Sequence, residues 1–229
     1  MKFIVVGLGN FGASLALKLT EMGHEVIGVD NSMAKVSLLR DSITHTVCLD
    51  STDVQAVGTL PLRETDVAIV AIGEDVGASI MATAVLKQLK VKRVIGRAIS
   101  PLHETVLGAM GITDVVHPEA ETAERLAKKL DIKGIIDSFN LTDRYNIIEA
   151  TVPNRYVGQT IGEVNFRNKY NVVILTIIRK TEQKNVLGAV HKVSEVIGVA
   201  APEMRFEQDD VLVLFGNIKD IQRILAEDG

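Results

Sequence analysis

The sequence predicts an α/β protein: a Rossmann-like, doubly wound parallel sheet followed by a small α+β C-terminal subdomain. A glycine-rich turn, Gly7–Gly12, follows an apolar run near the N-terminus, and the next apolar run ends in Asp30. Short apolar runs then alternate with helical segments as far as about residue 117. From Asn140 onward β-branched residues dominate between turn residues, which is typical of a largely antiparallel sheet.

The apolar runs of the first part indicate strands that are buried on both faces, because most are continuous rather than alternating. Their predicted positions are Phe3–Val6, Val26–Val29, Thr46–Leu49, Val67–Ile72, Val94–Gly96 and Thr113–Val116. The intervening helices have recognisable ends. Ser51, Thr52 and Asp53 offer an N-cap, Ser100 precedes a proline at a first helical position, and another helix starts at Pro118.

The second part predicts strands at Tyr145–Val152, Val172–Ile178, Val186–Val190 and Val211–Phe215, and a final amphipathic helix at Ile218–Ala226. The segment Ile132–Asp137 is apolar for a linker, so we expect it to pack against something, such as a second subunit. The predicted organisation is a nucleotide-binding domain (1–117), a helical crossover and dimerisation connector (118–139) and a regulatory subdomain (140–229).

Composition excludes several classes of protein. The 229 residues carry a net charge of −4 and no Trp, and neither half is basic, which argues against nucleic-acid binding. No apolar run approaches the roughly 20 residues of a membrane span, and the N-terminus lacks a signal-peptide pattern. The single cysteine, Cys48, excludes an internal disulfide and fits a reducing compartment. We therefore expect a cytoplasmic protein.

The glycine-rich turn has the chemistry of a dinucleotide site. Gly7 permits a tight turn after the strand, Gly9 leaves room for a pyrophosphate, and Gly12 allows the helix to pack close to the sheet. The free N–H groups of that helix attract anionic oxygens. Asp30 can accept hydrogen bonds from ribose hydroxyls and would repel a 2′-phosphate. The alternative is a fold that keeps these glycines for packing and binds nothing.

Further candidates follow the other strands, because ligands bind beyond the carboxyl edge of such a sheet. Asp50–Thr52 can face an adenine or ribose, or simply cap the next helix. Gly73 allows close approach of a ligand after the fourth strand. Arg97 can face phosphates or form a surface salt bridge. Glu119 lies in a first helical turn, where a carboxylate is stabilised without any further purpose.

Catalytic residues are harder to find. The five histidines form no metal-binding spacing, no nucleophile elbow occurs, and about 90 C-terminal residues are few for a substrate domain. His117, at the ligand edge, precedes a proline and suits a helix cap or loop. We expect a non-enzymatic protein. The alternatives are an NAD-dependent oxidoreductase and a soluble redox or nucleotide sensor that acts on other partners.

Several passages together resemble one known family, the cytosolic regulatory subunits of Trk/Ktr-type potassium uptake systems, which are built from an RCK (KTN) domain. The resemblance spans essentially the whole chain. The passages are Val5–Gly12, Gly23–Asp30, Val70–Ser79, Gly111–Glu119, Tyr156–Glu163, Tyr170–Val172 and Asp209–Val213.

The resemblance implies a nucleotide-sensing gating subunit that binds ATP, ADP or NAD(H). It also implies a homodimer that assembles into a ring, commonly an octamer, under a membrane-embedded potassium channel subunit at the inner face of the membrane. A second effector, a cyclic dinucleotide in some relatives, would bind the C-terminal subdomain. Glu119 would lie near the phosphates with a divalent cation. The implied nucleotide-binding residues are Gly7, Leu8, Gly9, Asn10, Phe11, Gly12, Asp30, Asn31, Asp50, Ser51, Thr52, Ala71, Ile72, Gly73, Glu74 and Arg97.

One residue departs from the pattern of many Ktr-type members. Asn10 stands where they carry an arginine that can contact the terminal phosphate of ATP. Losing such a charge-assisted contact weakens discrimination for a triphosphate by about 1.5–3 kcal/mol, if nothing replaces it. ADP, AMP and NAD(H) therefore stay open beside ATP as the ligand.

Overall fold

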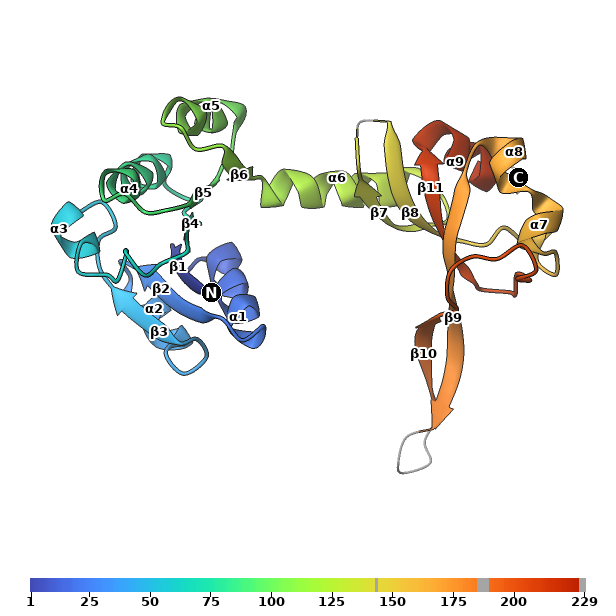
Figure 1. Ribbon diagram of the computed structural model, residues 1–229, viewed down its shortest axis with the longest axis horizontal. Helices are drawn as coiled ribbons and strands as arrows, with labels where there is room; N and C mark the ends of the chain where they lie inside the picture. Colours follow the sequence, from blue (N-terminus) through green and yellow to red (C-terminus); the bar gives the residue numbers. More distant parts are fainter. Residues whose placement is uncertain (143, 185–189, 227–229) are drawn as a thin grey trace. The chain divides into compact units, whose positions relative to one another are not determined.

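The computed structural model describes residues 1–142, 144–184 and 190–226 (Figure 1). The chain divides into two compact units, Met1–Ala120 and Glu121–Gly229. Each unit has its own sheet and its own apolar core.

The first unit is built on a parallel six-stranded sheet with the order β3-β2-β1-β4-β5-β6. All strands predicted for this part of the chain are present, and the order confirms the predicted doubly wound sheet. The strands are β1 (Lys2–Val6), β2 (Glu25–Asp30), β3 (His45–Cys48), β4 (Val67–Val70), β5 (Val94–Arg97) and β6 (Asp114–Val116).

Neighbouring residues of these strands point to opposite faces, and both faces are buried. On β1, Ile4 and Val6 belong to one apolar cluster and Val5 belongs to another. On β4, Ala68 belongs to the first of these clusters and Ile69 belongs to the second. A strand that is covered on both faces needs apolar residues at every position, which explains the continuous apolar runs of the sequence.

The helices of the first unit connect these strands. Asp53 caps α3 by accepting from the backbone N–H groups of Gln55 and Ala56, and Ser100 caps α5 by accepting from His103. Within the described residues no helix is long and apolar enough to cross a bilayer. The helices are α1 (Asn10–Glu21), α2 (Met33–Leu39), α3 (Val54–Val57), α4 (Val76–Gln88), α5 (Pro101–Ala109) and α6 (Pro118–Asp131), which crosses the boundary between the units.

The order of the sheet reverses between β1 and β4, which pair in parallel although two strands and three helices separate them along the chain. At such a reversal the connections after the two strands run to opposite faces of the sheet, and a crevice opens at the carboxyl edge. Gly7 follows β1 and Ala71 follows β4 at this point. The topology thus places the glycine-rich turn beside a crevice.

The second unit contains an antiparallel five-stranded sheet with the order β10-β9-β11-β8-β7. The final helix begins and ends at the predicted residues. The elements are β7 (Ile135–Asn140), β8 (Tyr145–Thr151), η1 (Asn154–Tyr156), α7 (Ile161–Val164), α8 (Phe166–Tyr170), β9 (Val173–Lys184), β10 (Val190–Val196), β11 (Val211–Asn217) and α9 (Ile218–Ala226).

In the second part, one detail differs from the sequence-based prediction and another is not tested. The apolar segment Ile132–Asp137 ends inside strand β7, which pairs with β8, so part of the predicted connector belongs to the sheet. Its apolar side chains Ile132 and Ile135 are buried in the core of this unit. The predicted strand Val186–Val190 lies outside the described residues except for its last residue, and the described strand β10 begins there.

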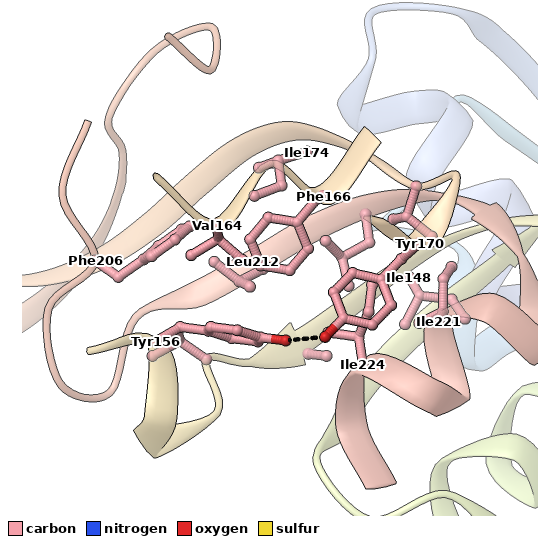
Figure 2. Close-up of a cluster of buried hydrophobic side chains, with 14 of the residues drawn as sticks. Ile148, Tyr156, Val164, Phe166, Tyr170, Ile174, Phe206, Leu212, Ile221 and Ile224 are labelled. Carbon is pink, nitrogen blue, oxygen red and sulfur yellow. Dashed lines mark hydrogen bonds between the residues drawn. The ribbon is translucent and has the colours of Figure 1, made fainter. Parts of the chain in front are cut away.

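The core of the second unit is aromatic as well as aliphatic (Figure 2). The ring of Phe166 lies edge-on against Tyr156 and Phe206, with ring centroids 5.1 and 5.9 Å away. The hydroxyl groups of Tyr156 and Tyr170 are 2.7 Å apart and share a hydrogen bond, which satisfies both inside the core. Burial, together with this hydrogen bond, raises the pKa of Tyr156 to about 12.

Candidate functional site

The glycine-rich turn has the geometry that its sequence predicts. Gly7 has a φ of +92°, in the left-handed region, and a Cβ there would lie 2.9 Å from Ile72 Cγ1. A side chain at Gly12 would place its Cβ 1.9 Å from the carbonyl oxygen of Gly7. These two glycines therefore let β1 turn sharply and let α1 pack directly against the turn.

Gly9 is different, because its missing side chain leaves open space. A Cβ built on Gly9 would meet nothing within 4 Å. Gly9 is also the N-cap of α1, and the first turn of that helix carries no acidic side chain. The backbone N–H groups of a first helical turn lack intrahelical acceptors. Open space over such a turn is suited to an anionic group.

Asp30 holds this turn in place. Its Oδ2 accepts a hydrogen bond of 2.7 Å from the backbone N–H of Leu8, and its Oδ1 accepts one of 2.9 Å from Ser32. The ammonium of Lys35 lies 3.9 Å from Oδ2. The carboxylate is almost fully buried, yet its two oxygens have about four acceptor positions, so it can still accept from a ligand.

Two adjoining cavities lie at the carboxyl edge of the sheet. The first, which we call the glycine-loop cavity, has a volume of about 200 Å³. The second, the Asp30 cavity, has about 180 Å³. Gly7, Lys35, Ile72 and Glu74 line both cavities, so the two lie side by side. The other lining residues are Gly9, Asn10, Phe11, Ala71, Gly73, Arg97 and Glu119 for the first, and Asp30, Asn31, Asp50, Ser51, Thr52, Asp75 and Ala78 for the second.

These cavities bring nearly all of the predicted site residues together. Leu8 and Gly12 are the exceptions, since both are buried and act through the backbone and packing of the turn. Among the lining residues that the sequence reasoning missed, which also include Asp75 and Ala78, Lys35 is the one with a positive charge. It lies in the first turn of α2, five positions after Asp30. Lys35 could have been found from the sequence, because it is a basic residue that follows closely after the end of a predicted strand.

The Asp50–Thr52 turn is available to a ligand. Asp53, and not these residues, caps α3. Asp50 instead accepts hydrogen bonds from the backbone N–H and the hydroxyl of Thr52, at 2.9 and 2.7 Å. These bonds lower the pKa of the Asp50 carboxyl. The turn therefore presents an ionised carboxylate at the wall of the Asp30 cavity.

Arg97 is the second cation of the glycine-loop cavity. Its Nη1 donates to the carbonyl oxygen of Ala71 at 2.9 Å, and its Nη2 donates to Glu119. The guanidinium carbon lies 5.4 Å from the ring centroid of Phe11, which is within the range of a cation–π contact. A Cβ on Gly73 would come within 2.6 Å of the guanidinium, so this glycine is what leaves room for Arg97.

A metal role for Glu119 stays a prediction. Burial raises the pKa of the Glu119 carboxyl, but the hydrogen bond and the charge of Arg97 outweigh it, so the net shift is downward. The carboxylate faces this guanidinium, and the described residues contain no group of three or more His, Cys, Asp or Glu side chains that could hold a metal ion. In the structure the Glu119 carboxylate therefore pairs with a cation of the chain itself, Arg97.

A third cavity, of about 400 Å³, lies beyond Arg97 and Glu119. It shares Gly73, Arg97 and Glu119 with the glycine-loop cavity. On its far side the imidazole Nε2 of His117 lies 3.2 Å from a carboxylate oxygen of Glu104. The Arg97–Glu119 pair thus stands between two cavities along the same edge of the sheet.

Comparison with known proteins agrees with this architecture. The TrkA-N domain family matches residues 3–118, and the TrkA-C domain family matches residues 147–228. The Ktr system potassium uptake protein C of Bacillus subtilis is 34% identical over 222 residues, which cover 97% of this chain and 95% of the relative. The chain therefore belongs to the TrkA/Ktr family of potassium uptake proteins, as the motifs predicted.

Two solved structures support the fold. The crystal structure of the GsuK RCK domain superimposes with a TM-score of 0.64 at 17% identity and covers 98% of this chain and 47% of that chain. The NAD(P)-binding domain of an exopolyphosphatase-related protein from Archaeoglobus fulgidus matches with a TM-score of 0.51 at 26% identity, over 56% of this chain and 96% of that one. The first likeness shows that this chain has the RCK fold.

Proposed function

We propose that this protein is a non-enzymatic, nucleotide-sensing regulatory subunit of a potassium uptake system. The observation that carries the proposal is the open space over Gly9, at the N-terminus of α1 and at the reversal point of the sheet. An adenine nucleotide (ATP, ADP or AMP) or NAD(H) would place its phosphates there, held by the first-turn N–H groups with Lys35 and Arg97.

The Asp30 cavity would hold the adenosine half of the ligand. The buried carboxylate of Asp30 would accept from a ribose hydroxyl, and Asp50–Thr52 would face the base or sugar. The Archaeoglobus structure, which is 26% identical to this chain, is described as an NAD(P)-binding domain, and this likeness supports a dinucleotide as one candidate. The side chain of Asn10 has no charge. The electrostatic attraction to phosphate would therefore come from Lys35 and Arg97, which line the cavity.

The proposed partner is a membrane-embedded potassium channel or transporter subunit, and the family membership supports it. This protein would form a homodimer and then a ring, such as an octamer, at the inner face of the membrane. Domain 1–117 would bind the nucleotide. Segment 118–139 would join subunits, and domain 140–229 would have the regulatory role. A second effector and a divalent cation at Glu119 remain part of the proposal.

The test is potassium uptake in cells of the source organism from which the gene for this protein has been deleted. Rubidium serves as the tracer for potassium. The deletion should make the rate of rubidium uptake abnormal, and the wild-type gene should restore the normal rate. The Gly9→Val variant should not restore it, because valine fills the phosphate space while the backbone has room for a Cβ. Normal uptake in the deletion strain would contradict the proposal.

A further inference from the structure

Three contacts fix the guanidinium of Arg97 at the wall of the glycine-loop cavity. The residue ends β5, and its Nη1 is anchored to the carbonyl oxygen of Ala71 at 2.9 Å. The ring of Phe11 lies against it, and Gly73 lies close on another side. These contacts come from two different connections of the sheet edge, since Ala71 and Gly73 both follow β4 and Phe11 lies in the first turn of α1. The charge of Arg97 is therefore held in position before any ligand arrives.

One edge of this guanidinium is taken by Glu119. The Nη2 of Arg97 donates to Glu119 Oε1, and Glu119 belongs to the first turn of α6. The two side chains differ in their surroundings, since that of Arg97 is 14% exposed and that of Glu119 is 60% exposed. The arginine is thus a fixed part of the wall, whereas the glutamate reaches it from the solvent side.

A carboxylate and a phosphate bind the same edge of a guanidinium, because both present paired oxygens to its N–H groups. Glu119 lines the glycine-loop cavity together with Gly9, where the proposed phosphates would lie. One N–H of Nη1 is bound to Ala71, and the carboxylate of Glu119 takes an N–H of Nη2 that a phosphate in the cavity would otherwise use. A phosphate that binds this N–H of Arg97 must displace Glu119 from it.

We propose that Glu119 competes with the phosphate groups of the nucleotide for Arg97 and so lowers the affinity of the site. The inference rests on the proposed function, since it assumes a phosphate-bearing ligand in the glycine-loop cavity. Glu119 acts as a carboxylate of the chain itself that occupies the phosphate-binding edge. Once displaced, it returns to water and to the favourable N-terminal end of α6, so its release costs little.

The Glu119→Gln variant tests this directly. Calorimetric titrations with ADP, ATP and NAD+ are made in EDTA, so that no divalent cation can bridge the carboxylate to phosphate. Because partly exposed ion pairs contribute little, we expect binding to tighten roughly two- to five-fold. Adenosine, which has no phosphate, should bind the variant and the wild type equally. Glu121→Gln removes the same charge two residues further along α6, outside both cavity linings, and should change nothing.

An Arg97→Gln background separates competition from a general charge effect. There Glu119→Gln should no longer tighten binding, because the cation for which Glu119 competes is gone. Weaker or unchanged binding of the phosphate ligands by Glu119→Gln in EDTA would overturn the inference, as would equal tightening in both backgrounds. If wild-type protein binds none of the nucleotides, the proposed function fails first, and the inference fails with it.

Discussion

Single residues of the proposed site also have structural roles. Asp30 was expected to contact a ribose, and it also fixes the glycine-rich turn through the N–H of Leu8. Gly73 was expected to let a ligand approach, and the structure shows Arg97 in the space that a side chain would take. Changing either residue would therefore alter the shape of the cavity as well as its contacts.

Lys35 provides the first prediction at this scale. The Lys35→Ala variant should bind ATP and ADP about tenfold more weakly, near the lower end for a charge-assisted phosphate contact, because its side chain is 42% exposed. Adenosine binding should be unchanged. Lys18→Ala, on the exposed side of α1, is the matched control. An equal loss for adenosine would mean that Lys35 supports the cavity rather than the phosphates. Titration calorimetry measures all of these affinities.

His103 provides a prediction about pH. It is buried in α5, and within the described residues neither ring nitrogen has a hydrogen-bond partner. Burial lowers its pKa below the value of about 6.5 of a free imidazole. The unfolded chain therefore takes up a proton that the folded state resists, and the free energy of unfolding should fall as the pH drops below about 6.5.

The His103→Met variant should lose less stability than the wild type between pH 7.5 and pH 5, because its buried side chain cannot take up a proton. Thermal melts followed by circular dichroism at several pH values measure the difference. All other ionisable groups are common to the two proteins, so their contributions cancel in the comparison. If stability falls equally with pH in the two proteins, His103 does not contribute to the pH dependence of stability.

At the scale of elements, the contact between β1 and α1 depends on close approach. Gly12→Ala would force a Cβ into the carbonyl oxygen of Gly7, so the turn would have to move. We expect a loss of about 1–3 kcal/mol in the free energy of unfolding of the first unit. Gly9→Ala, where space is open, should change stability by less than about 1 kcal/mol. Urea titration followed by circular dichroism compares them, and equal losses would contradict the packing account.

A second prediction concerns the contact between β9 and the turn before β11. Asp210 is fully buried and accepts from Arg179 at 2.8 and 2.7 Å and from the backbone N–H of Glu207 at 2.7 Å. Asp210→Asn would leave the arginine without its buried counter-charge, at a cost of about 3 kcal/mol.

Tyrosine fluorescence measures this loss selectively. The chain has no Trp, and all of its tyrosines (Tyr145, Tyr156 and Tyr170) belong to the second unit. Asp209→Asn changes the same charge at an exposed neighbour and should have little effect. If the two variants unfold at the same urea concentration, the buried pair does not hold these strands together.

The sequence predicted those elements in which a local pattern agrees with tertiary packing. The strands of the first sheet are short, mostly apolar and separated by helices, so their positions could be predicted. Strand β7 was missed because its polar residues, Asp137 and Ser138, interrupt the apolar pattern. Most site residues could be predicted because parallel strands all end at one edge. The Arg97–Glu119 contact could not, since the two residues lie 22 positions apart and no local pattern joins them.

At the scale of the whole molecule, the chain joins a Rossmann-like unit to a second unit with its own core. Family membership connects this architecture to potassium uptake. The central claim is that the N-terminal unit binds a nucleotide at the glycine-rich turn. Regulation of a membrane partner depends on that binding, so the binding is what has to be tested first.

The most direct test is a thermal-shift titration of the purified protein with ATP, ADP, AMP, NAD+ and NADH. A ligand that binds only the native state raises the unfolding temperature in proportion to its affinity and concentration. We predict a concentration-dependent rise for at least one of these nucleotides with the wild type and none with Gly9→Val, whose own melting temperature should stay close to that of the wild type. No rise with any nucleotide, or an equal rise with Gly9→Val, would contradict the account.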